Sequence, residues 1–163
     1  MAQTVEFLFD TGLERYKAGE SPESLIPVFK EVCDRSPKTS AAWVCLAWLY
    51  LLDNKPKLAY KAAQKAVKLN PQDPQARVNL AVSMLEAGET ELRPVTKKGF
   101  GKPSAVSTME TGEKGLREHI EVAKNLIFVD QEWEKEIKDS IADGLTRKPD
   151  WQSLIKVKTW LFE

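Results

Sequence analysis

A set of large, small and aromatic residues returns at a spacing of about 34 positions along this chain. In the clearest copy the set is Trp43, Leu46, Ala47, Tyr50, Ala59, Ala63, Ala66 and Pro71. At the same offsets one period earlier stand Phe9, Gly12, Leu13, Tyr16, Leu25, Phe29, Val32 and Pro37. One period later the set begins again with Arg77, Leu80, Ala81 and Met84. A unit this short cannot bury its apolar face alone, so the copies must stack on one another.

Within each copy the apolar residues recur at intervals of three and four, as on one face of an α-helix, and no segment alternates over the length of a strand. The sequence therefore predicts an all-α fold. The expected helices span about 3–18, 22–35, 39–53, 55–69 and 74–87. Ser21-Pro22, Asn54-Lys55-Pro56 and Asp73-Pro74 each place a capping oxygen just ahead of a proline that the first helical turn tolerates.

The third copy is interrupted after its first helix. The repeat pattern requires a small residue at position 93, in the second helix of this copy. The chain has Arg93 there, followed by Pro94, and this pair does not fit inside a helix. The helical pattern resumes at Leu116 and Ile120. We therefore expect an inserted loop over about 89–111, a segment rich in glycine, proline and hydroxyl residues.

Three helical segments are expected after the insertion. The first begins as early as Thr108, where a capping box starts, and runs to about 128. The second covers about 131–145 and begins after Asp130; it should cap the apolar face of the last copy. The tail from 150 to 162 has its apolar residues close to one face and predicts a short amphipathic helix.

In its period and in the order of these residues the chain resembles the tetratricopeptide repeat (TPR) family. The resemblance implies a solenoid of antiparallel helix-turn-helix units in a single domain. The repeats would span about 6–39, 40–73 and 74–128, with a C-terminal cap at 130–163. The first helices of such units line a concave groove that binds proteins, so the resemblance implies a binding module and not an enzyme.

The resemblance also implies which side chains face the groove. The expected partner-binding residues on these helices are Asp10, Glu14, Val44, Cys45, Trp48, Val78, Asn79 and Val82. The middle of this groove is apolar and would favour aggregation unless something covers it. Trp43 takes the family's packing position between the paired helices. The insertion is expected to be a mobile spacer; the alternative is a docking segment with Phe100 as its anchor.

Composition excludes several other functions. The 24 basic and 24 acidic side chains cancel, so we expect no nucleic-acid partner, and helical-repeat RNA binding is only a disfavoured third hypothesis. The apolar run at 41–52 is shorter than the ~20 residues of a membrane span. No secretory signal is visible at the start, and Cys33 and Cys45 are expected to be buried thiols, which fits the cytoplasm or another reducing compartment.

A single histidine, His119, does not make a catalytic set, and no spacing suggests a metal site. We therefore expect no catalysis, cofactor or metal. The sequence predicts an adaptor or assembly factor that binds a partner polypeptide through the apolar groove. The alternative is a structural subunit whose groove is permanently filled, either by its own tail from Trp151 to Phe162 or by another copy. The partner's identity and the oligomeric state stay open.

Overall fold

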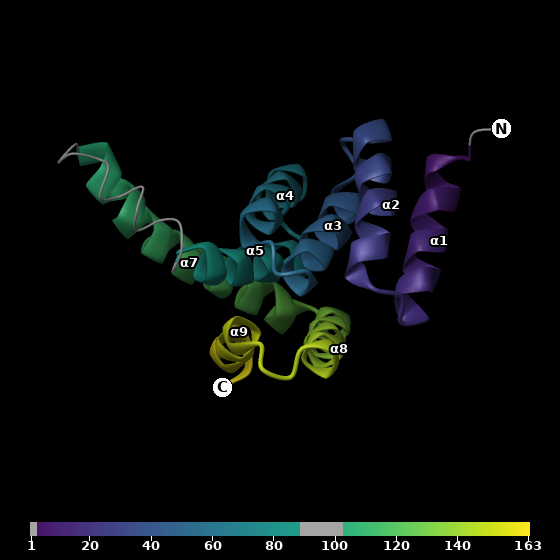
Figure 1. Ribbon diagram of the computed structural model, residues 1–163. Helices are drawn as coiled ribbons and strands as arrows, with labels where there is room; N and C mark the ends of the chain where they lie inside the picture. The colour runs from purple at the N-terminus through teal and green to yellow at the C-terminus, as the bar shows by residue number, and fades with distance from the viewer. Residues whose placement is uncertain (1–2, 89–102) are drawn as a thin grey trace.

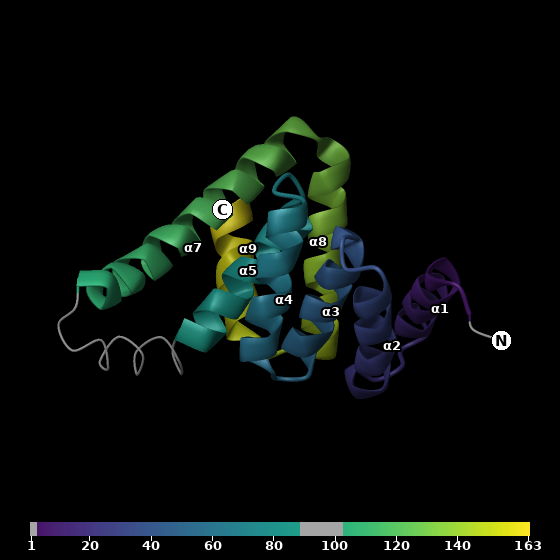
Figure 2. The ribbon, with the colours of Figure 1, turned by 90° about the horizontal axis from the view of Figure 1, so that it is seen from above.

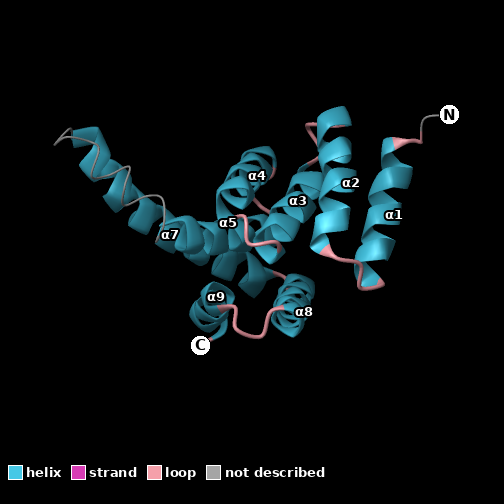
Figure 3. Ribbon diagram, viewed as in Figure 1, coloured by secondary structure: helices cyan, strands magenta, loops and turns pink. Residues whose placement is uncertain are grey.

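The computed structural model describes residues 3–88 and 103–163, with side chains for 3–88 and 115–163. Throughout these residues the regular elements are helices (Figure 3). They are α1 (Val5–Lys17), α2 (Pro22–Arg35), α3 (Ser40–Leu52), α4 (Pro56–Leu69), α5 (Pro74–Ala87), α7 (Pro103–Val129), α8 (Gln131–Arg147) and α9 (Gln152–Phe162). The expected all-α class is confirmed, and the first helices begin and end within two residues of their expected bounds.

Local sequence explains where these helices begin. The Ser21 and Asp73 side chains accept hydrogen bonds from backbone N–H groups of the first turns of α2 and α5, as expected for N-caps. Asp130 does the same for α8, its carboxylate accepting from the Glu132 N–H at 2.9 Å. The cap expected from Asn54 is wrong: the N-cap of α4 is Lys55, no side chain caps the helix, and only Pro56 in the first turn favours a start there. The starts of α2 and α5 could be predicted from the sequence because a cap involves only neighbouring residues.

Consecutive helices from α1 to α5 contact one another in chain order, and α7 continues the series by packing on α5. α2 and α4 begin one 34-residue period apart, at Pro22 and Pro56 (Figure 1). The shared core of this stack includes Phe29 of α2, Leu49 of α3 and Leu80 of α5, all buried. The structure therefore has the helix-turn-helix arrangement of a TPR-like solenoid.

α7 begins earlier than expected, at Pro103. The capping box at Ser107 to Glu110 therefore does not start a helix, because the chain is already helical there. The loop expected over 89–111 is therefore wrong for residues 103–111, which are helical. Its first part, at 89–102, lies outside the described residues, and so does Phe100.

α8 and α9 form as expected, and they pack on helices of the third copy. After Asp130 the chain turns back, and both helices contact α5 and α7 (Figure 2). Figure 1 shows them along one side of the stack, opposite α4. They lie across the concave face, by which we mean the side of the stack lined by α1, α3 and α5. The apolar residues on that face had to be covered, and the C-terminal helices cover them in part.

Candidate protein-binding cleft

Trp48 lies at the middle of the concave face and is covered by the chain itself. Its ring packs against that of Trp151, with centroids 5.1 Å apart, and only 8% of the residue is exposed. Gly144 of α8 passes directly over the same ring: a Cβ there would lie 2.8 Å from Trp48 Cζ2 and 2.9 Å from a methyl carbon of Leu154. Glycine is therefore what lets α8 approach the indole so closely.

A cluster of polar side chains, made of Tyr16, Asp143 and Arg147, joins α8 to α1. The Tyr16 hydroxyl donates to the Asp143 carboxylate and accepts from Trp48 Nε1 at 2.8 Å. Arg147 stacks over the Tyr16 ring at 3.9 Å and donates to the Tyr16 carbonyl at 2.8 Å. Burial and the Asp143 carboxylate raise the pKa of Tyr16 far above its usual range, so the phenol keeps its proton and remains a donor.

Three further hydrogen bonds, from Lys148 and Trp151, hold the segment between α8 and α9. The Lys148 ammonium donates to the Leu51 carbonyl at 3.0 Å and to Asn54 Oδ1 at 2.9 Å, at the end of α3. Trp151 Nε1 donates to Glu86 Oε1 of α5 at 2.6 Å. These charge-assisted bonds fix the C-terminal helices in one place on the concave face.

Several expected groove residues are internal. Val78 and Val82 are fully buried in the core. Asn79, also fully buried, donates to the Val44 carbonyl at 3.0 Å and accepts from Gln75 Nε2 at 2.8 Å, so its polar atoms join α5 to α3. Whether any of them contacts a partner stays a prediction, and a partner could reach them only after rearrangement.

The other expected residues remain accessible in part. Asp10 and Glu14 are exposed on α1, and Val44 and Cys45 are half-buried on α3. Burial raises the pKa of Cys45 to about 12, so this thiol is uncharged near neutral pH.

Between α1, α3 and α8 a part of the concave face stays open, which we call the concave cleft. Its volume is about 720 Å³. The residues that line it are Leu13, Tyr16, Lys17, Phe29, Val44, Cys45, Trp48, Leu49, Gln75, Glu136, Asp139, Ser140, Asp143 and Arg147. Its floor is mainly apolar, whereas α8 supplies a polar wall with more acids than bases. A volume of this size suits a short peptide segment or a few large side chains.

Sequence reasoning missed the α8 wall. In the sequence the acid pair Glu132 and Glu136 is most simply explained as a solvated helix face, and nothing local indicated that α8 would turn back onto α1. The available signal was Gly144 in the last turn of α8, because a glycine inside a helix can have a packing reason.

The two tryptophans of α3 lie in different environments. Trp48 is buried, whereas Trp43 is half-exposed and lines a groove on the opposite side of α3, with its Nε1 donating to the Pro37 carbonyl at 2.9 Å. The packing position expected for Trp43 between the paired helices is thus only partly enclosed.

Within the described residues no group of three or more His, Cys, Asp or Glu side chains is placed to hold a metal ion. The helices of the described segments also include none that is long and apolar enough to cross a membrane.

The fold and the cleft together define an all-α helical-repeat protein with a TPR-like arrangement and a C-terminal helix pair on its concave face. No family model matches the chain, and no curated protein matches it. Among solved structures, 22 chains are similar. One of them, "MamA RS-1 ArsTM double mutant", is 15% identical, with 99% of this chain and 94% of that chain covered and a TM-score of 0.48.

Proposed function

We propose that this protein is an interaction scaffold that binds a segment of a partner polypeptide in the concave cleft. The observation that carries the proposal is that the cleft keeps an apolar floor open to solvent between α1 and α8, although Trp48 and Val82 on the same face are buried. An adaptor or assembly role, membership of the TPR family and a single domain over 1–163 are parts of the same proposal, supported by the 34-residue spacing of the helices.

The charges of the cleft favour a basic partner segment. On the α8 wall Glu136 and Asp139 are exposed, while Asp143 is paired with Arg147. On α1, Asp10 and Glu14 are exposed and lie within a turn of Leu13, which lines the cleft. Lys17 is the one basic residue that α1 contributes to the lining of the cleft. An apolar anchor flanked by lysine or arginine would fill the floor and meet these carboxylates.

The test uses a fluorescein-labelled synthetic peptide with a Leu-Phe pair flanked by arginines, and a matched peptide flanked by glutamates. We expect fluorescence anisotropy to show binding of the arginine peptide in preference to the glutamate peptide. Asp139→Lys should weaken binding several-fold, because it turns an attraction into a repulsion at the rim. Glu118→Lys makes the same charge change on α7 outside the cleft and should not. Equal affinity for the two peptides, or equal loss in the two variants, would contradict the proposal.

The Trp48–Trp151 contact favours a second candidate, in which the C-terminal helices close the concave face permanently and the protein is a structural subunit. In that case the intact protein should bind neither peptide. A variant that lacks 150–163, checked by circular dichroism for its helical content, should then expose Trp48 and bind the apolar dye ANS, while the intact protein does not. Peptide binding by the intact protein would exclude this candidate.

A further inference from the structure

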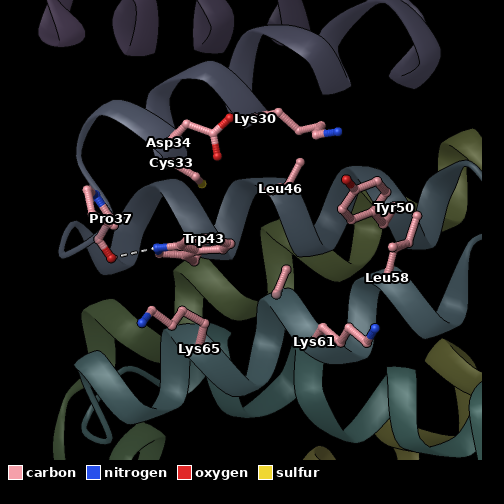
Figure 4. A pocket seen from close by; sticks show the side chains of 11 residues that line it. Lys30, Cys33, Asp34, Pro37, Trp43, Leu46, Tyr50, Leu58, Lys61 and Lys65 are labelled. Carbon is pink, nitrogen blue, oxygen red and sulfur yellow. Dashed lines mark hydrogen bonds between the residues drawn. The ribbon is translucent and has the colours of Figure 1, made fainter.

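A second groove lies on the side of α3 opposite the concave cleft. It runs between α2 and α4, has α3 as its floor, and measures about 560 Å³ (Figure 4). We call it the convex groove. The residues that line it are Lys30, Cys33, Asp34, Pro37, Trp43, Leu46, Tyr50, Leu58, Lys61, Ala62 and Lys65.

The floor of the convex groove is apolar and aromatic. Trp43 and Leu46 of α3 lie along it, as does Tyr50 near the far end (Figure 4). Leu58, on the α4 side, is 43% exposed. Burial is the first cause that raises the pKa of Cys33, to about 12, so this thiol is also uncharged near neutral pH. Large apolar side chains at a solvent-open groove are the kind of surface that binds a partner.

The rim of the groove is basic. α4 carries four lysines, at positions 57, 61, 65 and 68, and no acidic residue. Lys61 and Lys65 line the groove one helical turn apart, and Lys30 faces them from α2 (Figure 4). Within the described part of the chain these three lysines make no ion pair. Asp34 is the opposing charge, so the groove keeps a net positive rim.

We propose that the convex groove binds an acidic amphipathic helix of a partner protein. Its apolar side chains would lie on Trp43, Leu46 and Leu58. Its carboxylates, repeated one turn apart, would pair with Lys61 and Lys65, which have the same spacing along α4.

The groove is already shaped for this contact. The hydrogen bond from Trp43 Nε1 to the Pro37 carbonyl, 2.9 Å long, fixes the plane of the indole before any partner arrives (Figure 4). A rigid aromatic anchor loses little conformational freedom on binding. A peptide is favoured over a nucleic acid because much of the lining is aliphatic, with Leu46, Leu58 and Ala62, and because it contains no arginine.

The test uses a fluorescein-labelled synthetic helical peptide with leucines and one phenylalanine on one face, and glutamates one turn apart beside them. The full-length protein should bind this peptide in a fluorescence anisotropy titration. The double variant Lys61→Glu/Lys65→Glu should weaken binding by about tenfold or more, since two rim attractions become repulsions. Lys68→Glu changes the same kind of charge on the same helix outside the groove and should leave the affinity within about twofold.

Two further measurements make the result decisive. Trp43→Ala should abolish binding, while its circular dichroism spectrum and that of the double variant should match that of the native protein. If Trp43→Ala loses helical signal, Leu58→Ser replaces it, because Leu58 is already exposed. A peptide with serines in place of the apolar residues, and a single-stranded RNA of 15 nucleotides, should not bind.

Failure of the acidic peptide to bind would overturn the proposal. So would equal loss in Lys68→Glu, or equal binding of the serine peptide or the RNA, which would indicate an unspecific polyanion surface. Asp139→Lys should not change affinity for the acidic peptide, so this proposal and the proposed function can fail independently.

Discussion

Trp48 of α3 and Trp151, which precedes α9, pack against each other with their ring centroids 5.1 Å apart and their planes inclined by 43°. This contact joins the repeat stack to the C-terminal helices. It makes the concave face a partly closed surface, with the concave cleft between α1, α3 and α8 still open.

Gly144→Ala should destabilise the protein. The new methyl group would lie 2.8 Å from a ring carbon of Trp48, and overpacking of this kind costs about 1–3 kcal/mol. Alanine gains about 1 kcal/mol in helix propensity, but we expect the clash to dominate because Trp48 is held between Tyr16 and Trp151. Urea unfolding measures the change. As control, Gly115→Ala in α7 meets only the flexible end of Met84, at 3.4 Å, and should be neutral or stabilising.

Trp151→Ala should lower the free energy of unfolding by about 3–5 kcal/mol, the usual cost of truncating a buried aromatic residue. Trp151 is 3% exposed and also donates to Glu86. Trp160, in α9 but 41% exposed, provides the comparison, and Trp160→Ala should change stability by about 0.5 kcal/mol or less. Similar losses in the two variants would mean that the ring contact does not hold the C-terminal helices.

Asn79→Ala should cost about 1–3 kcal/mol, because it removes a buried amide that bonds both the Val44 carbonyl and the Gln75 side chain. Gln75→Ala removes only one of these bonds from a half-buried position and should cost less. Chemical denaturation of both variants gives the order. A larger loss for Gln75→Ala would contradict the role of Asn79 as the link between α3 and α5.

Stability should fall as pH drops below about 6.5, the ordinary pKa of histidine. His119 Nδ1 lies 2.8 Å from Arg77 Nη1, and burial, followed by the Arg77 charge, lowers the pKa of His119 in the folded state. As the pH falls, His119 therefore takes up a proton in the unfolded chain before it does so in the folded protein. The stability that neutral His119 contributes to the folded state is complete above pH 6.5 and is lost on acidification. The measurement is the urea midpoint at pH 7.5 and 5.5. His119→Gln should show a smaller drop between them than the native protein.

Neither cysteine should react with Ellman's reagent in the folded protein at pH 8. Burial is the main cause that raises the pKa of both Cys33 and Cys45 to about 12, so almost no thiolate is present. Both should react after unfolding in guanidinium chloride. Rapid modification of one thiol under native conditions would show that its segment opens readily.

The sequence by itself determined the helices of the stack. Their starts depend on caps and prolines such as Ser21-Pro22 and Asp73-Pro74, and their faces on apolar spacing, all of which involve near neighbours in the chain. The tail helix and the Asp130 cap of α8 could be predicted for the same reason. The start of α7 was misjudged because its first turns are rich in hydroxyl residues and glycine, which weaken a local helical signal.

The tertiary structure alone decided where α8 and α9 lie and therefore which part of the groove is open. The contacts responsible join positions far apart in the chain: Tyr16 with Asp143, Leu51 with Lys148, and Glu86 with Trp151. Side-chain geometry across such distances leaves no periodic trace in a sequence. Trp48 was correctly placed at the middle of the concave face, but its burial depended on a glycine and an indole that only the folded chain brings to it.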